Sequence, residues 1–555
     1  MSFCLLDRFP VELIHQIFAY LSAHEIVYAF SGTTEYLNGI VATYDRYVVA
    51  FHAITKCQFD MTCRCLRPEQ ILSLTFSDDD EASKQSEIFF SYFNIEQFTH
   101  LRSFNMESIN SDTCNKLTQL HQLQQLTTIS LSHVFQRVCP EFSTSIQKLL
   151  PQLNQLAVYN VYCLLNDPLP NLHHLALRYC DCRHLVTILT LMPNLRTFDV
   201  ILTCGVRSHW PIELPLLLYL KKFTLRTEGE YLTLSQVEKF LSKTPNLKHF
   251  ELETEGLKEL FDGERWEPIV SGLSRFDFRI HCSDTSNNIF EREHVLQSFR
   301  SLFWLEQKRW FVAYYTPNAR EIFTVPRFLS TIGNYPSVNW PPQCTLPDFP
   351  FAKHITHLQC SALYPLIADQ FPNITSLTIH TNRTLDGQTL VQVIEQMKFL
   401  YSISIVDLSI VNHIPINVVF EKIRSLSVQE FSTSDSDQTI HDLDRVCFTF
   451  PRLERLNMKL LSHIHLFRLI DQLKYLSIAK FELHQSSSES PTMQRNWLIN
   501  NCRRFQTTDN FTFRYVNDTI YLWMATENAN NLGALTLTDT EPLSTWYSRL
   551  SCVLQ

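Results

Sequence analysis

The sequence predicts an α/β fold with a curved parallel sheet on its inner side and helices on its outer side. Two observations predict it. An apolar phrase of strand length recurs at intervals of roughly 20–29 residues, and helical stretches lie between its copies. A third observation, an apolar stripe at helical spacing near the start of the chain, places a separate helical segment before the repeating array.

The helical segment at residues 5–50 has the pattern of three short helices. Pro10 suits the first position of a helix, and Ser22 with Glu25 forms the Ser-x-x-Glu pattern that caps a second one. A third helix is expected from Tyr36 to Tyr44. Full burial of the first helix's stripe would contribute roughly 7–15 kcal/mol before entropy, so this helix requires other helices or a partner to cover it. The stripe consists of Leu13, Ile14, Ile17, Phe18 and Leu21.

The same segment carries a motif. The run Phe9-Pro10-x-Glu12-Leu13-x-x-x-Ile17-Phe18-x-Tyr20-Leu21, followed by Glu25-Ile26, resembles an F-box. Phe9 replaces the family's first leucine, Glu25-Ile26 replaces its acidic-leucine pair, and the usual tryptophan of the third helix is missing. The resemblance implies binding to the Skp-type adaptor of a cullin–RING ubiquitin ligase. The implied adaptor contacts are Pro10, Glu12, Leu13, Ile17 and Leu21. Pattern alone fits an ordinary three-helix cap equally well.

The recurring phrase is a leucine or a relative, two residues, an apolar residue, one residue, and an apolar residue. This period and spacing are those of a leucine-rich repeat, and the alternating apolar pair fits a strand with one buried face. The first block is Leu101/Phe104/Met106, Leu126/Ile129/Leu131, Leu153/Leu156/Val158, Leu172/Leu175/Leu177, Leu195/Phe198/Val200, Leu220/Phe223/Leu225, Leu247/Phe250/Leu252 and Leu273/Phe276/Phe278. The second block is Ile355/Leu358/Cys360, Ile374/Leu377/Ile379, Leu400/Ile403/Ile405, Ile423/Leu426/Val428, Leu453/Leu456/Met458 and Leu473/Leu476/Ile478.

Several copies follow a Pro-x-Leu lead, and the proline ends the helix before it because the residue preceding a proline disfavours helix. The stretch Ser235 to Lys243 is an example of such a helix. Leucine-rich repeats usually place Asn or Cys three residues past the last strand leucine; Cys180 and Asn382 fit this turn position, whereas Val161, Glu228 and Glu255 do not. We therefore expect an irregular leucine-rich-repeat solenoid.

Two hairpins and a helix are expected outside the repeats. An amphipathic helix is predicted from Phe290 toward Trp310, followed by a hairpin with its turn at 316–319. A second hairpin, 511–516 with 519–523 around Asn517-Asp518, could cap the last repeat. The predicted boundaries are 1–50 F-box, 51–95 linker and acidic loop, 96–280 first repeat block, 281–350 inserted helix, hairpin and Pro-rich segment, 351–485 second block, and 486–555 C-terminal cap.

Composition excludes several function classes. The net charge is −9 with no basic stripe, so a nucleic-acid partner is not expected. No apolar run reaches the length of a membrane span and no signal peptide is visible, so no membrane is expected. Only ten glycines occur, none in a GxG pair, which excludes the Rossmann, P-loop and GxSxG motifs. The sixteen cysteines are scattered, which favours reduced thiols in the cytoplasm or nucleus.

Candidate chemistry is weak. His52, Cys57, Cys63 and Cys65 lack the common zinc spacing, and the acidic residues at 435–444 lack the glycine and glutamate of a calcium loop. No Ser/His/Asp set stands out, so neither a metal, a cofactor nor a catalytic residue is predicted.

The residues between strand leucines are expected on the concave face, which repeat arrays use for binding. Their mixture of arginine and glutamate favours a protein partner. The sequence thus predicts a substrate receptor of a ubiquitin ligase. A repeat scaffold without ligase coupling is the alternative, and an enzyme is the third hypothesis. The candidate partner-binding residues are Tyr159, Arg178, Arg226, Glu251, Glu253, Asp277, Arg279 and His380.

Overall fold

The computed structural model describes most of the chain between residues 5 and 525. The described ranges are 5–52, 54–77, 85–109, 111–134, 140–160, 167–203, 214–282, 292–315, 320–329, 342–360, 371–380, 387–430, 436–460, 462–483, 495–507 and 511–525. These residues form two compact units. The first unit consists of 1–108, 122–126 and 446–555, and the second of 109–121 and 127–445.

The first unit combines both ends of the chain. Its helices are α1 (Val11–Phe18), α2 (Ala23–Phe30), α3 (Glu35–Thr43), α4 (Lys56–Cys65), α5 (Gln85–Tyr92), α16 (His463–Gln472), α17 (Arg495–Asn501) and α18 (Arg503–Thr507). Its strands are β1 (Tyr47–Ala50), β2 (Ile71–Phe76), β3 (Ser103–Ile109), β18 (Arg455–Leu460), β19 (Ile478–Leu483), β20 (Phe511–Val516) and β21 (Thr519–Met524).

The second unit contains most of the repeats. Its helices are α6 (Ser111–Lys116), α7 (Pro140–Leu149), α8 (Cys182–Leu191), α9 (Leu234–Ser242), α10 (Gly263–Val270), α11 (Arg292–Ser298), α13 (Gly387–Gln396), α14 (Ser409–Asn412) and most of α15 (Ser436–Thr449). Its strands are β4 (Thr128–Val134), β5 (Gln155–Val158), β6 (His174–Cys180), β7 (Thr197–Thr203), β8 (Lys222–Leu232), β9 (His249–Gly256), β10 (Arg275–Cys282), β11 (Phe311–Tyr315), β12 (Arg320–Val325), β13 (Gln343–Cys344), β14 (His357–Cys360), β15 (Ser376–Ile379), β16 (Ser402–Asp407) and β17 (Ser425–Glu430). Within the described residues, no helix is long and apolar enough to cross a lipid bilayer.

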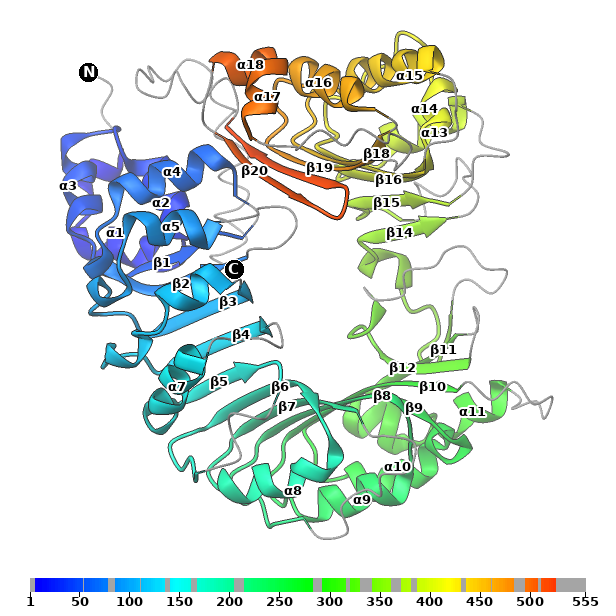
Figure 1. Cartoon of the computed structure of the whole chain (residues 1–555). Helices are drawn as coiled ribbons and strands as arrows, with labels where there is room; N and C mark the ends of the chain where they lie inside the picture. The colour runs from blue at the N-terminus through cyan, green and yellow to red at the C-terminus, as the bar shows by residue number, and fades with distance from the viewer. Residues whose placement is uncertain are drawn as a thin grey trace. The chain divides into compact units, whose positions relative to one another are not determined.

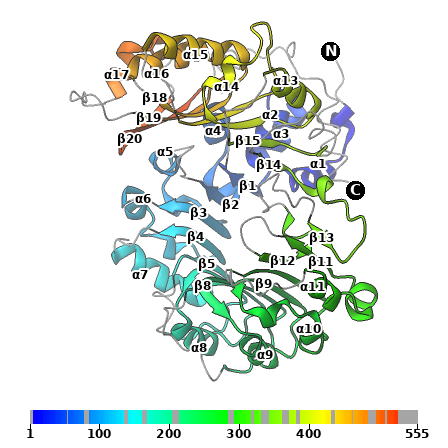
Figure 2. The same ribbon diagram turned by 90° about the vertical axis from the view of Figure 1, so that its right-hand side faces the viewer.

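Every copy of the apolar phrase in the sequence coincides with a strand, from β3 to β10 and from β14 to β19. All members of these copies are buried, with at most 6% of their surface exposed. In the second unit, β4 to β10 pair with parallel register and helices α8, α9 and α10 cover one face of this sheet (Figures 1 and 2). Strands β14 to β17 pair in the same parallel manner. The leucine-rich-repeat fold is therefore confirmed.

Two repeats precede the first predicted copy. The phrase also occurs at Tyr44/Tyr47/Val49 and Ile71/Leu74/Phe76, all of them buried, and β1 pairs parallel with β2, and β2 with β3. Helix α3 ends at Thr43, one residue before the expected Tyr44, which is its C-cap and packs edge to face against Tyr47 of β1. Residues 51–95, expected as a linker, carry α4, β2 and α5, whereas the acidic stretch 78–84 lies outside the described residues.

The first predicted hairpin extends the sheet of the second unit. Strand β12 pairs antiparallel with β10 and with β11, while its predicted turn at 316–319 lies outside the described residues. The single helix predicted from Phe290 toward Trp310 was wrong, because α11 ends at Ser298 and a π-helix occupies Phe303–Lys308. The hydroxyl of Ser298 donates to the Val295 carbonyl and accepts from the Gly263 N–H, which fixes the helix end against α10.

The asparagine that follows the proline in several of these repeats has a structural role that the sequence analysis did not assign. The side-chain amide of each asparagine donates to a backbone carbonyl of the preceding repeat: Asn171 to Pro151 at 2.8 Å, Asn194 to Pro170 at 2.9 Å, Asn246 to Leu218 at 2.8 Å and Asn373 to Lys353 at 2.7 Å. These bonds satisfy carbonyls that no strand pairs, and they tie neighbouring repeats together.

A row of stacked rings fills the core of the same unit. Phe198, Phe223, Phe250 and Phe276 come from four successive strands, and their ring centroids lie 5.6–5.7 Å apart with interplanar angles of 17° or less. The strict register of β7 to β10 places these rings at one level. The residue before and the residue after each phenylalanine therefore face away from the core, and each of these two sets is aligned across the four strands.

The C-terminal hairpin closes the first unit. Asn517 and Asp518 both have positive φ, as a tight hairpin turn requires, and β21 pairs antiparallel with β19. Its Trp523 is fully buried; its indole N–H donates to the Ile54 carbonyl at 3.1 Å, and its ring meets Phe59 of α4 edge to face. The hairpin thus caps the last repeat and also contacts the helix that follows the first strand.

Candidate functional site

Strands β7 to β10 present three aligned rows of side chains on the face opposite the buried phenylalanines. The parallel register places the residues of each row side by side across the four strands. We call them the first, second and third rows. The first row is Thr197, Lys222, His249 and Arg275; the second is Asp199, Thr224, Glu251 and Asp277; the third is Ile201, Arg226, Glu253 and Arg279.

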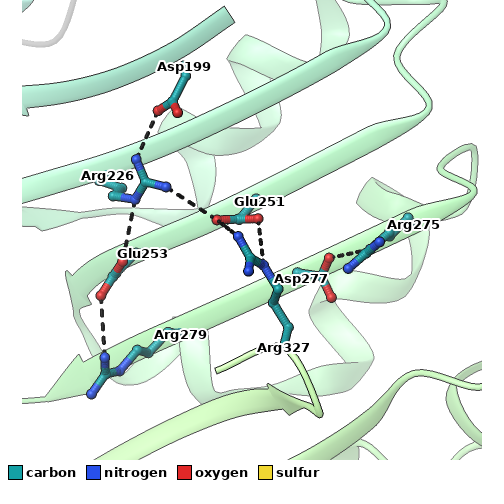
Figure 3. Close-up of polar contacts among 8 residues, drawn as sticks. All are labelled: Asp199, Arg226, Glu251, Glu253, Arg275, Asp277, Arg279 and Arg327. Atoms are coloured by element: carbon teal, nitrogen blue, oxygen red, sulfur yellow. Dashed lines mark hydrogen bonds and ion pairs between the residues drawn. The ribbon is translucent and has the colours of Figure 1, made fainter. Parts of the chain in front are cut away.

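Arg226 is the centre of an ion-pair network between the second and third rows (Figure 3). Its guanidinium lies 2.9 Å from a carboxylate oxygen of Asp199, 3.4 Å from Glu251 and 3.6 Å from Glu253. A planar guanidinium offers five donors, so one arginine can serve three carboxylates from the two neighbouring strands.

The network continues onto the inserted hairpin. Arg279 pairs with Glu253 at 3.5 Å and with Glu321 of β12, which also approaches His281. Glu321 is buried, and a buried carboxylate requires such partners. The hairpin therefore supplies a carboxylate to the third row.

Arg327, which follows β12, holds Glu251 from the other side. Its Nε and Nη2 donate to the two carboxylate oxygens of Glu251 at 3.1 and 3.2 Å, a bidentate pair in which only 12% of the Glu251 side chain is exposed. The hydrogen bond to Glu251 raises the pKa of Arg327. Arg275 donates to Asp277 on its own strand. Each carboxylate of the second row therefore has at least one arginine partner.

A depression of about 250 Å³ opens where the first and second rows meet. Three strands and Arg327 form its wall. Burial and the positive charges of Arg275 and Lys222 lower the pKa of His249, so this imidazole is neutral near pH 7. The lining residues are Lys222, Phe223, His249, Phe250, Glu251, Arg275, Asp277 and Arg327.

The structure brings together some of the predicted partner-binding residues and separates others. Arg226, Glu251, Glu253 and Arg279 share the network just described, and Asp277 pairs with Arg275 within β10. Three others lie elsewhere in the second unit. Tyr159 follows β5 and stacks on Tyr179 with centroids 6.2 Å apart, Arg178 is exposed on β6, and His380 follows β15.

The sequence analysis missed several members of the site. Asp199 occupies the same repeat position as Glu251 and Asp277, and Lys222, His249 and Arg275 lie two residues earlier on the same face of their strands, so the repeat alignment itself carried the signal. Glu321 and Arg327 had no such signal, because only the pairing of β12 with β10 brings them to the repeats.

The implied adaptor contacts lie on and just after α1. Ile14 and Phe18 point into the first unit and are buried, whereas Pro10, Glu12 and Leu13 are exposed and Ile17 and Leu21 are half-buried. Glu25 caps α2, as its motif predicts, by accepting from the Ser22 N–H at 2.8 Å.

The cysteines and the acidic residues at 435–444 are further candidates for nucleophiles or metal ligands. Burial raises the pKa of Cys63, Cys180 and Cys360 to about 12, so these thiols stay protonated at neutral pH. Within the described ranges, no group of three His, Cys, Asp or Glu side chains is placed to hold a metal ion. Asp442, from the run resembling a calcium loop, lies in α15 and accepts from the side chain of Asn412 at 2.7 Å.

No protein-family model matches the sequence, and no curated protein matches it significantly. Among solved structures, a chain of the yeast Rad7 and Elc1 complex matches with 13% identity and a TM-score of 0.30, over 71% of this chain and 86% of that one. An internalin from Listeria monocytogenes matches with 12% identity and a TM-score of 0.17, over 85% and 91%. A chain of the mouse RP105/MD-1 complex matches with 11% identity and a TM-score of 0.16, over 75% and 63%. Such low scores support no argument about function, and the fold rests on the strand register described above.

Proposed function

We propose that the chain is the substrate-recognition subunit of an SCF-type ubiquitin ligase in the cytoplasm or nucleus. In this proposal the helices of segment 5–50 bind a Skp-type adaptor, and the repeats hold a protein for modification by other subunits. The motif from Phe9 to Ile26 motivates the adaptor part of the proposal.

The observation that carries the proposal is the apolar surface that α1 and its neighbours leave uncovered. A helix in a simple cap buries its apolar side chains against the fold it covers. Here Ile14 and Phe18 do so, yet Leu13 remains 45% exposed among other exposed apolar side chains of the same segment. Several exposed apolar side chains within one short segment favour a protein–protein contact there. The others are Leu5, Phe9, Val11, Tyr20, Tyr28 and Tyr36.

The repeats support the second part of the proposal through their charged face. The three rows present arginines and carboxylates side by side from four strands, which suits recognition of a polar protein surface.

Co-expression with a Skp-type adaptor and affinity purification tests the proposal. The wild-type chain is expected to retain the adaptor at stoichiometric yield. Leu13→Asp is expected to lose it, because a carboxylate would be buried without a partner at the interface. Leu218→Asp is the matched control, because Leu218 is 47% exposed in the second unit and the same change there should leave adaptor binding intact.

Circular dichroism and thermal unfolding of both variants show whether they stay folded. If the folded wild-type chain retains no adaptor, the ligase proposal is refuted. A chain that captures a protein through the repeats without the adaptor would then be a scaffold, the alternative function.

A further inference from the structure

The first row of the charged face carries positive charge that the protein itself leaves largely uncompensated. Lys222 is exposed, and among the described residues no carboxylate pairs with its ammonium group. Arg275 lies two strands away in the same row, with its Nε directed to Asp277. Burial and the positive charges of both residues lower the pKa of His249 between them, and the charges of Asp277 and Glu251 oppose this shift.

The carboxylates of the second row do not cancel this field. Glu251 is shared between Arg226 and Arg327, and Asp277 already accepts from Arg275. The depression is lined by three cations, Lys222, Arg275 and Arg327, and by two carboxylates, Glu251 and Asp277. A net positive charge therefore remains among the residues that line the recess.

We propose that this recess binds a glutamate or aspartate side chain of the protein that the repeats hold, with Lys222 as its principal ion-pair partner and His249 and Arg275 beside it. This inference rests on the proposed function, because it names the part of the partner that the repeats recognise. A volume of about 250 Å³ suits one such side chain with its neighbouring backbone.

The chemistry favours a carboxylate over a cation or an apolar group. An entering cation would meet Lys222, Arg275 and Arg327, and an apolar group would desolvate these cations without replacing their hydration. A carboxylate satisfies the unpaired ammonium and accepts from an arginine, while Arg226 and Arg327 keep Glu251 from repelling it. Complementary charge of this kind sets specificity more than total affinity.

Fluorescence polarisation on the full chain, alone or with its adaptor, tests the inference. The probe is a fluorescein-labelled peptide of alternating glutamate and serine, and the comparison peptide replaces each glutamate with glutamine. We expect saturable binding of the glutamate peptide that weakens as salt rises, with no saturation by the glutamine peptide. Lys222→Ala should raise the Kd about threefold to fivefold and Lys222→Glu about tenfold.

Lys221→Ala is the matched control, because Lys221 is the neighbouring exposed lysine and does not line the recess. It should change the Kd by less than about twofold. Equal binding of the two peptides, equal effects of the two lysine variants, or no saturation below about 1 mM peptide would overturn the inference. Adaptor co-purification is measured separately. A chain that retains the adaptor but ignores the peptide contradicts only the inference, and the reverse result contradicts only the ligase proposal.

Discussion

Trp523 of the C-terminal hairpin packs against α4 within the first unit. Truncation of its side chain should therefore lower the stability of the hairpin and of α4 together. Its side chain is fully buried between β21 and α4, and its N–H satisfies the Ile54 carbonyl. The ammonium of Lys56, itself 5% exposed, lies 5.6 Å from the indole centroid and pairs with Asp60. Residues from opposite ends of the sequence therefore share one packed cluster.

The expected magnitude follows from these contacts. Replacing a buried tryptophan with alanine costs about 3–5 kcal/mol through lost contacts and the cavity that remains. Within that sum, the orphaned Ile54 carbonyl accounts for about 1–3 kcal/mol. Trp523→Phe keeps most of the ring but removes the N–H, so we expect it to cost about 1–2 kcal/mol. A domain is typically stable by about 5–15 kcal/mol, so Trp523→Ala should remove much of the stability of this unit.

Hydrogen exchange with mass spectrometry, together with urea unfolding, measures the effect by segment. Trp523→Ala should accelerate exchange in α4 as much as in β21 and β19, although α4 lies far away in sequence. Phe250→Ala is the matched control, because it truncates a buried ring in the second unit and should accelerate exchange in β8 to β10. If Trp523→Ala leaves the protection of residues 56–65 unchanged, the contact between the chain ends does not stabilise the fold.

Three further predictions concern repeat contacts and pH. Asn194→Ala should lower the unfolding free energy by about 1 kcal/mol in urea titrations by removing the bond to Pro170, and Asn194→Asp should cost at least as much because a carboxylate cannot donate it. Gly387→Ala should destabilise the fold by about 1–3 kcal/mol, because the new Cβ would lie 1.6 Å from the His413 carbonyl oxygen. Gly39→Ala is the control: it has open space in α3 and should stabilise the fold by about 0.5–1 kcal/mol. Thermal melts that show equal effects of the two substitutions would contradict the packing at Gly387. Burial lowers the pKa of five histidines, namely His24, His174, His249, His463 and His465. Around and below their ordinary pKa of 6.5 the unfolded chain therefore binds more protons than the folded chain, and the unfolding free energy should fall as the pH drops from about 7.5 to about 5.5. A flat profile of unfolding free energy against pH would contradict these shifts.

Local patterns in the sequence predicted the strands and both hairpins well, because alternation and turn residues act over a few positions. The first repeats were missed for a related reason. Tyr44 continues the helical spacing of Leu37, Ile40 and Val41 and also begins the phrase Tyr44/Tyr47/Val49, and only tertiary packing decides between the two patterns. Contacts over long separations had no local signal: Arg327 meets Glu251 across 76 residues, and Trp523 meets Ile54 across 469.

The candidate partner-binding residues also show a limit of reasoning from composition. Arginine and glutamate on a repeat face suggest binding groups, yet Arg226, Glu253 and Arg279 already pair with one another and with neighbouring carboxylates. A partner that engaged them would first have to break these pairs, so they fix the shape and charge pattern of the face more than they supply affinity. Affinity is more readily gained at Lys222, whose ammonium group lines the recess and pairs with no carboxylate among the described residues. Substitutions of the paired residues should therefore act mainly through the stability of the second unit, and substitutions of Lys222 through binding.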